Sequence, residues 1–175
     1  MYQLLLLRHA KSSWDDPATS DHDRPLNARG RRAVATMRAA LRDLGLIPDM
    51  ILVSSARRTQ ETLALLEPWD DTPLVEVMDP LYLAPPARLL TILQNVAESV
   101  RSVMVIGHNP GLHELAIALV GPDALDGRTG PAQRLNEGFP TTALAEFAVV
   151  GPWQSLHGGD GRLVRFLTPR DLGAQ

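Results

Sequence analysis

The chain has 175 residues, 45% of them hydrophobic and 21% charged, a balance that is typical of globular proteins and excludes a disordered chain. Because it contains no cysteine, disulfides, thiol nucleophiles and thiolate metal sites are excluded. The formal net charge of −3 gives no overall positive field for nucleic acid or an anionic membrane surface, so any anion site must be local.

The length fits one domain over residues 1–175. The apolar start Leu4–Leu7 is too short for a signal peptide, and Arg8 and His9 follow it at once. No later apolar run approaches the roughly 18 residues that are needed to cross a bilayer. We therefore expect a single-domain cytoplasmic protein that contacts neither membrane nor nucleic acid.

The first half of the chain alternates between strand and helix patterns. Tyr2–Leu7 is a continuous apolar run, which is typical of a strand covered on both faces. Asn27 is a candidate N-cap for a helix that Gly45 ends. A second buried strand is predicted at Asp49–Ser54, and a helix over Arg57–Leu66 follows it.

The same alternation continues in the second half. A strand is predicted at Pro73–Met78, an amphipathic helix at Ala87–Val100 and a third core strand at Ser102–Ile106. Another helix is predicted over His113–Val120, and Asn109, four residues before it, is a candidate N-cap.

The last third of the chain has a different composition. Residues Gly121–Gly138 are rich in Gly, Pro and Asp, which predicts a long surface loop. Thr142–Val150 and Arg162–Leu167 are predicted to be closing strands. The whole pattern predicts an α/β fold, a three-layer sandwich in which a mostly parallel central sheet carries helices on both faces.

Basic and imidazole side chains follow three of the predicted core strands. They are Arg8 and His9, Arg57 and Arg58, and His108. Ligands of open α/β sheets bind beyond the carboxyl ends of the strands, so these side chains are expected to meet in one pocket.

Such a set of side chains suits phosphoryl transfer. A neutral imidazole attacks phosphorus, and a covalent phosphohistidine splits one difficult transfer into two easier ones. Guanidinium groups and a cationic histidine stabilise the negative charge on the transferred oxygens. To keep His9 neutral, we expect a backbone carbonyl to hold its other ring N–H. No metal or cofactor is required, and the His108–His113 spacing does not suit a zinc site.

Three sequence blocks carry a family resemblance. The runs LLLRHAKS around His9, SSARRTQET at Ser54–Thr62 and GHNPG at Gly107–Gly111 resemble the histidine phosphatase superfamily, also called the phosphoglycerate mutase-like fold. The block DRPLNARG at Asp23–Gly30 is most similar to the SixA-type phosphohistidine phosphatases.

The resemblance implies roles for four residues. His9 is similar to the family's nucleophile, Arg8 and Arg58 to its phosphate clamps, and His108 to its second histidine, which holds phosphate in the protonated state. Arg57 falls outside the family pattern and is interpreted as a solvated residue at a helix end.

Two further residues are candidates for phosphate binding, each with an alternative. Arg24 resembles an arginine that reaches toward phosphate in short family members, but it also fits a loop arginine paired with Asp21 or Asp23. Ser12 follows His9 closely enough to touch phosphate, but a role in a turn fits it equally well. His22 and His157 lie in predicted loops and are interpreted as solvated.

The sequence departs from the family at the acid that protonates the leaving group. Pro80 stands at the carboxylate position, and the neighbouring Asp79 is the candidate substitute, although a residue before proline also shapes turns. A missing acid disfavours alkyl phosphate esters, whose alkoxide leaves poorly. A missing acid matters less for phosphohistidine, because its imidazole is protonated before the P–N bond breaks.

The sequence therefore predicts a SixA-like phosphatase that acts on phosphohistidine in a phosphorylated protein. A sugar phosphate or another small phosphorylated metabolite is the alternative substrate. A module that binds phosphorylated partners without catalysis is the alternative from another class.

Overall fold

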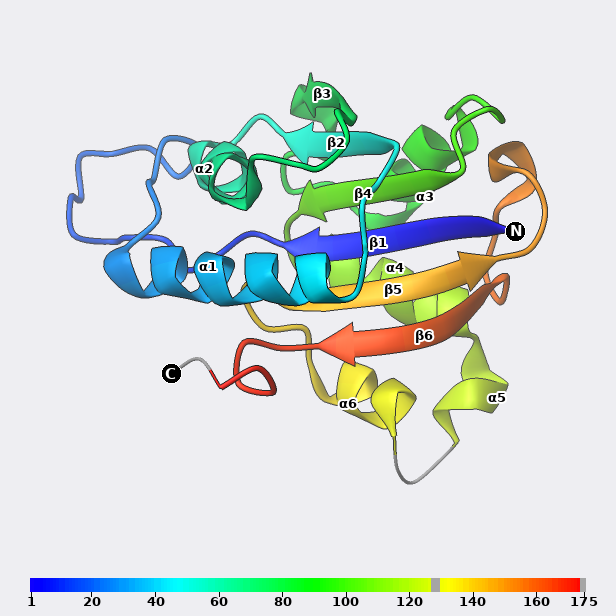
Figure 1. Ribbon diagram of the computed structural model, residues 1–175. Coiled ribbons are helices and arrows are strands. Elements are labelled where there is room, and N and C mark those ends of the chain that lie inside the picture. Colours follow the sequence, from blue (N-terminus) through cyan, green and yellow to red (C-terminus); the bar gives the residue numbers. More distant parts are fainter. Residues whose placement is uncertain (127–129, 174–175) are drawn as a thin grey trace.

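The structure is a computed structural model, and it describes residues 1–126 and 130–173 (Figure 1). The strands are β1 (Tyr2–Arg8), β2 (Met50–Ser54), β3 (Leu74–Met78), β4 (Ser102–Gly107), β5 (Leu144–Val149) and β6 (Gly161–Leu167). The helices are α1 (Ala28–Asp43), α2 (Arg57–Leu66), α3 (Pro86–Gln94), α4 (Gly111–Val120), α5 (Pro122–Leu125) and α6 (Pro131–Glu137), with the 3-10 helices η1 (Asp79–Leu81) and η2 (Trp153–Ser155).

The six strands form one sheet in the order β3-β2-β4-β1-β5-β6. The pairs β2–β3, β2–β4 and β1–β4 are parallel, and β5 runs antiparallel to its neighbours β1 and β6. The predicted mostly parallel sheet is confirmed. Parallel pairing places Arg8 beside Gly107, so His9 and His108 leave adjacent strands at the same edge of the sheet.

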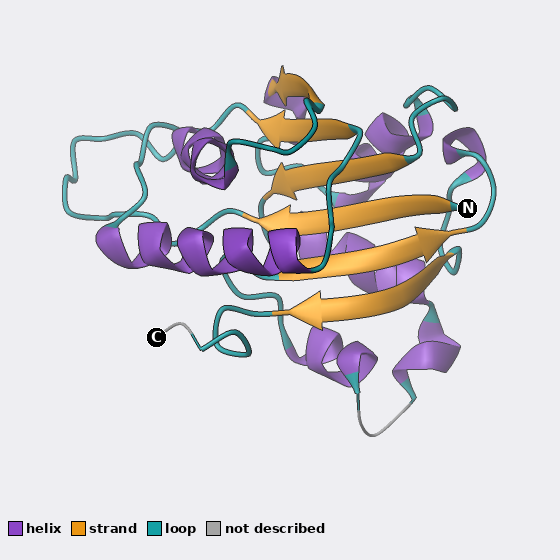
Figure 2. Ribbon diagram, in the orientation of Figure 1, coloured by secondary structure: helices purple, strands orange, loops and turns teal. Residues whose placement is uncertain are grey.

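Helices cover both faces of the sheet, as predicted (Figure 2). Side chains alternate along β1: Leu4 and Leu6 belong to the core under α3 and α4, whereas Leu5 and Leu7 belong to the core under α1 and α2. Two buried faces explain why the strand reads as a continuous apolar run. Among the described residues, no helix is long and apolar enough to cross a membrane.

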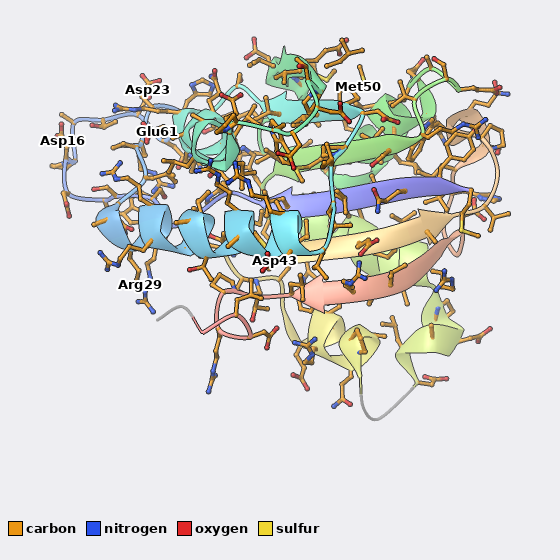
Figure 3. The ribbon with its side chains drawn as sticks, in the orientation of Figure 1. Asp16, Asp23, Arg29, Asp43, Met50 and Glu61 are labelled. Atoms are coloured by element: carbon orange, nitrogen blue, oxygen red, sulfur yellow. The ribbon has the colours of Figure 1, made fainter. Side chains whose placement is uncertain are left out.

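The connection between β1 and α1 is a long loop that extends beyond the sheet, and Asp16 and Asp23 project from it into solvent (Figure 3). Its end is fastened to its start by an isolated bridge between Ser12 and Leu26 and by Asn27 N, which donates to Lys11 O at 3.0 Å. The predicted N-cap is confirmed, because Asn27 Oδ1 accepts from Gly30 N at 2.7 Å. A Cβ on Gly30 would lie 2.2 Å from Lys11 O, so only glycine allows α1 to approach the segment after His9.

Several predicted boundaries differ from the structure by one or two residues, and the end of α3 differs most, because the helix ends at Gln94 instead of Val100. The helix α4 begins at Gly111, two residues before the predicted start at His113. Asn109 does not cap it, and its Nδ2 donates to Phe139 O at 2.8 Å instead.

The prediction of a long loop over residues 121–138 is wrong, because α5 and α6 lie within this range. Residues 127–129 are outside the described chain. Both helices begin with proline, whose fixed φ suits the first helical position, so composition alone misled the prediction.

Candidate active site

The structure brings Arg8, His9, Arg58 and His108 together at a cavity of about 390 Å³ beyond the carboxyl ends of β1, β2 and β4. The rings of His9 and His108 lie 5.2 Å apart between centroids. His9 and Arg8 end β1, Arg58 lies in the first turn of α2, and His108 follows β4. These four side chains form the floor of the cavity, and Ser12, Trp14, Asp21 and Arg24 also line it.

His9 is a buried, neutral imidazole. Its Nδ1 lies 2.7 Å from Ala10 O, and because a carbonyl only accepts, Nδ1 carries the proton and Nε2 keeps its lone pair. This is the backbone carbonyl expected from the sequence. Burial lowers the pKa of His9 to about 3, helped by the charges of Arg58 and Arg8 and opposed by the bond to Ala10. The ring is therefore in the nucleophilic form at neutral pH.

His108 is also neutral here, which differs from the expectation of a protonated ring. Its Nε2 lies 2.7 Å from Ser54 Oγ, and its Nδ1 lies 3.3 Å from Arg58 Nη2. A guanidinium only donates, so Nδ1 accepts and the ring proton sits on Nε2. Burial, together with the nearby His9 and Arg58, lowers the pKa of His108 to about 3.

The two floor arginines keep free donors. Arg8 Nη1 donates to Phe139 O at 3.0 Å, and Arg58 Nη1 donates to Asp21 O at 2.7 Å. In the described part of the chain, the buried Nε atoms of both arginines have no hydrogen-bond partner. Burial, followed by the charge of Arg58, lowers the pKa of Arg8. Two desolvated cations with unused donors are suited to bind an anion between them.

Arg24 lines the cavity and is paired with Asp21, as one interpretation of the sequence expected, and its binding to phosphate stays a prediction. Its guanidinium stacks on Trp14 at 3.5 Å from the ring centroid, and its Nε donates to Asp21 Oδ1 at 3.1 Å. Arg24 Nη1 also donates to Ser12 Oγ, which makes Ser12 part of the cavity wall. The indole of Trp14 is 75% exposed and lies at the open side of the site.

Comparison with known proteins agrees with this geometry. A profile of the histidine phosphatase superfamily (branch 1) matches residues 4–79. An uncharacterized protein of Mycobacterium tuberculosis is 35% identical over 164 residues, which cover 94% of this chain and 100% of that protein.

Solved structures extend the comparison to the whole fold. A protein of Agrobacterium tumefaciens, provisionally named phosphohistidine phosphatase SixA, is 31% identical with a TM-score of 0.80, over 96% of this chain and 98% of its own. The protein histidine phosphatase SixA in complex with tungstate is 26% identical with a TM-score of 0.76, over 97% and 99% of the two chains. The chain belongs to the histidine phosphatase superfamily. It falls in the SixA-type branch, and it is a phosphatase.

In this histidine phosphatase, the candidate acid Asp79 is outside the site. Asp79 is exposed at the first residue of η1 and does not line the cavity, so its predicted role as proton donor is wrong. The 3-10 turn that begins at Asp79 explains this, because Asp79 O accepts from Tyr82 N and it is Tyr82 that reaches the site.

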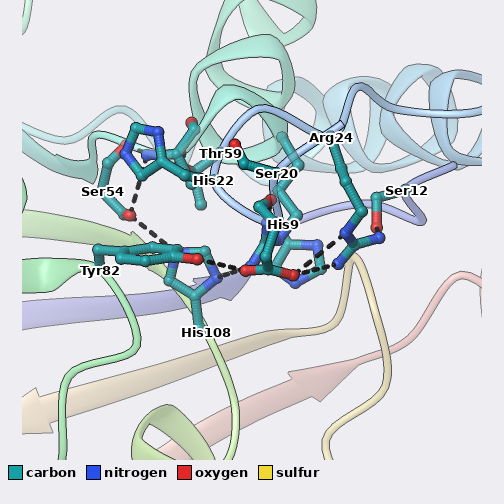
Figure 4. A network of polar contacts seen from close by, with 12 residues as sticks. His9, Ser12, Ser20, His22, Arg24, Ser54, Thr59, Tyr82 and His108 are labelled. Atoms are coloured by element: carbon teal, nitrogen blue, oxygen red, sulfur yellow. Dashed lines mark hydrogen bonds and ion pairs between the residues drawn. The ribbon is translucent and has the colours of Figure 1, made fainter. Parts of the chain in front are cut away.

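Tyr82 and Asp21 are residues of the site that the sequence analysis did not identify, and Figure 4 shows Tyr82 beside His108. The Tyr82 ring lies 5.4 Å from that of His108, and its hydroxyl donates to Asp21 Oδ2. Arg58 Nη2 donates to the same oxygen at 3.1 Å. Burial acts to raise the pKa of Asp21, but the bonds from Tyr82, Arg58 and Arg24 outweigh it and lower the pKa to about 2. In the sequence, Asp21 was visible only as a partner for Arg24.

His22 lies beside the site, whereas His157 and Arg57 lie on the surface. His22 was predicted to be solvated, and its side chain is 39% exposed, but its Nε2 also lies 2.9 Å from Ser55 Oγ and its ring packs on Tyr82. His157 is exposed, as predicted. Arg57 is also exposed and pairs with a glutamate of its own helix. Among the described residues, no cluster of three or more His, Asp or Glu could hold a metal ion.

Proposed function

We propose that this phosphatase hydrolyses phosphohistidine in proteins, with His9 as its nucleophile. The observation that carries the proposal is the neutral His9 imidazole beside the half-buried guanidinium group of Arg8 and the buried one of Arg58, whose Nε donors have no partner in the described chain. The names of the SixA relatives, which are phosphohistidine phosphatases, point to the same substrate.

The first step transfers the phosphoryl group to the enzyme. The Nε2 lone pair of His9 forms a P–N bond while the P–N bond of the substrate breaks, and that electron pair returns to the substrate's ring nitrogen. Arg8 and Arg58 bind the equatorial oxygens, which carry the spread negative charge. Their positions are fixed before reaction, so the stabilisation requires no reorganisation.

The second step returns the free enzyme. Water attacks the phosphorus of phosphorylated His9, the P–N bond breaks, and inorganic phosphate leaves with His9 neutral again. The phosphoryl group also brings negative charge beside His108, which offsets the influence of Arg58 and raises the pKa of His108. In the complex, a proton on Nδ1 then lets His108 donate to a phosphate oxygen.

The surroundings of the site favour a large substrate with a protonated leaving group. Asp79 lies outside the cavity, and Asp21, which lines it, is ionised at neutral pH because its pKa is lowered to about 2, so an alkoxide would find no proton donor among these carboxyl groups. A second cavity of about 530 Å³ adjoins the first and shares Lys11 and Thr141 with it. Together they give room for a protein segment around a phosphorylated side chain.

A substrate panel tests the proposal. Wild type is expected to hydrolyse a phosphohistidine protein faster than sugar phosphates, and His9→Ala is expected to lose roughly 10³-fold or more on both. Radiolabelled phosphate should be trapped on wild type and not on His9→Ala. His157→Ala, an exposed histidine far from the cavity, is the matched control and should behave as wild type.

Each other outcome has a definite meaning. Full activity of His9→Ala rejects the mechanism. Preference for sugar phosphates assigns the enzyme to small metabolites instead. Binding of phosphorylated protein without any turnover assigns it to the regulatory modules.

A further inference from the structure

Asp21 holds an unusual place in the cavity. Its Oδ1 accepts from Arg24 Nε at 3.1 Å and lies 3.1 Å from Arg24 Nη2, while its Oδ2 accepts from Arg58 Nη2 at 3.1 Å and from the Tyr82 hydroxyl. Its side chain is nevertheless 42% exposed. Among the described residues that line this cavity, it is the one acidic side chain.

The leaving group departs on the side of the cavity where Asp21 lies. His9 is 7% exposed and attacks from the buried floor. Phosphoryl transfer is roughly in line, so the leaving group lies opposite His9 and moves toward solvent. The exposed lining residues mark that side: Trp14 is 75% and Leu83 51% exposed. The half-exposed carboxylate of Asp21 belongs to the same open side.

The inference rests on the proposed function and adds the basis of its specificity. We propose that Asp21 selects substrates with a protonated nitrogen leaving group, because its carboxylate accepts a hydrogen bond from the ring N–H of the departing histidine. Asp21 is in this sense a specificity-determining residue that touches the substrate.

The chemistry of the transfer gives the carboxylate this effect. Phosphohistidine that carries a proton on its second ring nitrogen is cationic at the ring. When the P–N electron pair returns to the first nitrogen, the ring leaves as neutral imidazole and no proton has to move. An ionised carboxylate keeps the proton on the second nitrogen by a charge-assisted hydrogen bond.

The same carboxylate disfavours the hydrolysis of phosphate esters. An alkyl ester develops negative charge on its leaving oxygen and needs a proton, and an ionised Asp21 repels the charge and has no proton to give. The pKa of Asp21, lowered to about 2, keeps the group ionised at neutral pH.

Substrate binding itself frees Asp21 to act. Its two oxygens offer about four acceptor positions, and Arg24, Arg58 and Tyr82 fill them in this structure. The phosphoryl oxygens compete for the N–H groups of Arg24. When Arg24 donates to phosphate, Oδ1 of Asp21 becomes free to accept from the leaving ring, while Arg58 and Tyr82 stay on Oδ2 and keep the carboxylate ionised.

The experiment compares Asp21→Asn with wild type on a phosphohistidine peptide and on p-nitrophenyl phosphate, whose leaving group needs no proton. Asn keeps the size of the side chain and removes the charge. The ratio of kcat/KM for phosphohistidine over that for p-nitrophenyl phosphate should fall roughly 10- to 100-fold, the worth of one hydrogen bond to a charged group. Asp23→Asn, from the exposed part of the same loop, is the matched control and should leave the ratio unchanged (Figure 3).

A second measurement separates this role from a merely structural one. If Asp21 only held Arg24 and Arg58 in place, Asp21→Asn would lower kcat/KM equally for both substrates and would bind inorganic phosphate more weakly. The proposal requires an unequal loss and phosphate binding at least as tight as in wild type, since one negative charge is gone. Equal losses, or weakened phosphate binding, would overturn it.

Failure of the proposed function would give a different result from failure of the proposed role of Asp21. Wild type that is inactive on phosphohistidine but active on sugar phosphates rejects the proposed substrate. Phosphoramidate, whose leaving nitrogen is also protonated, then replaces phosphohistidine in the ratio. An unchanged ratio in Asp21→Asn would reject the role of Asp21 in either case.

Discussion

The floor of the cavity and its open side are built in different ways. On the floor, Arg58 is 2% and His108 3% exposed, and both are anchored close to the ends of neighbouring parallel strands. On the open side, Asp21 and Arg24 come from a long loop and hold each other through side chains. Sheet pairing fixes the first region, whereas side-chain contacts in irregular backbone fix the second.

This difference predicts how substitutions in each region of the site affect activity. Hydrogen bonds from backbone N–H groups hold the floor together: His9 N donates to the backbone oxygen of Gly107 at 3.1 Å, and Ala10 N donates to the side-chain Oγ1 of Thr62 at 3.0 Å. Substitution there disturbs the transfer of phosphate itself. On the proposed mechanism, substitution on the open side should leave the transfer step more intact and should change phosphate binding at Arg24 and the choice of leaving group at Asp21.

The largest effect is expected for Arg58 on the floor. Arg58→Ala removes a preorganised donor from the transferred phosphoryl group and should lower kcat/KM roughly 10²- to 10³-fold. Arg57→Ala is the matched control, since the neighbouring arginine is 56% exposed and bonds to Glu61. It should keep wild-type kinetics. Steady-state assays on one substrate compare the two, and equal losses would contradict the assignment of Arg58.

A smaller effect is expected for Arg24 on the open side. Arg24→Ala removes one charge-assisted contact to phosphate and should lower kcat/KM about 10-fold, mainly through KM. Arg31→Ala, an exposed arginine on α1, is the control. A loss as large as that of Arg58→Ala would remove the distinction between the floor and the open side.

The floor was predictable from the sequence for a physical reason. Buried strands of a parallel sheet are continuous apolar runs, and the first polar residues after them must lie at one edge. Arg8, His9 and His108 stand in these positions. The helix of Arg58 begins with the residue just before it, so its place near β2 followed from the same pattern.

The open side was not predictable in the same way. The contact between Tyr82 and Asp21 joins residues 61 positions apart, in a loop and a turn that have no periodic pattern. The position of Asp79 in the sequence made it a reasonable candidate for the proton donor, but the 3-10 turn that it begins brings Tyr82 to the site instead. Such contacts depend on the path of irregular backbone, which composition and periodicity do not specify.

The smallest effect concerns stability and tests the neutral state of the floor. The pKa of His9 is lowered to about 3 in the fold, whereas an unfolded chain binds this proton near pH 6.5, so acid favours unfolding below that pH. Between pH 7 and 5.5, wild type should lose about 1 kcal/mol more unfolding free energy than His9→Asn, as measured by urea denaturation. His157→Asn, at an exposed position, should follow wild type. Parallel losses in wild type and His9→Asn would mean that the pKa of His9 is the same in the folded and unfolded states. The fold would then not hold the ring in the neutral form, which has the lone pair needed to attack phosphorus, and His9 would gain a proton below about pH 6.5.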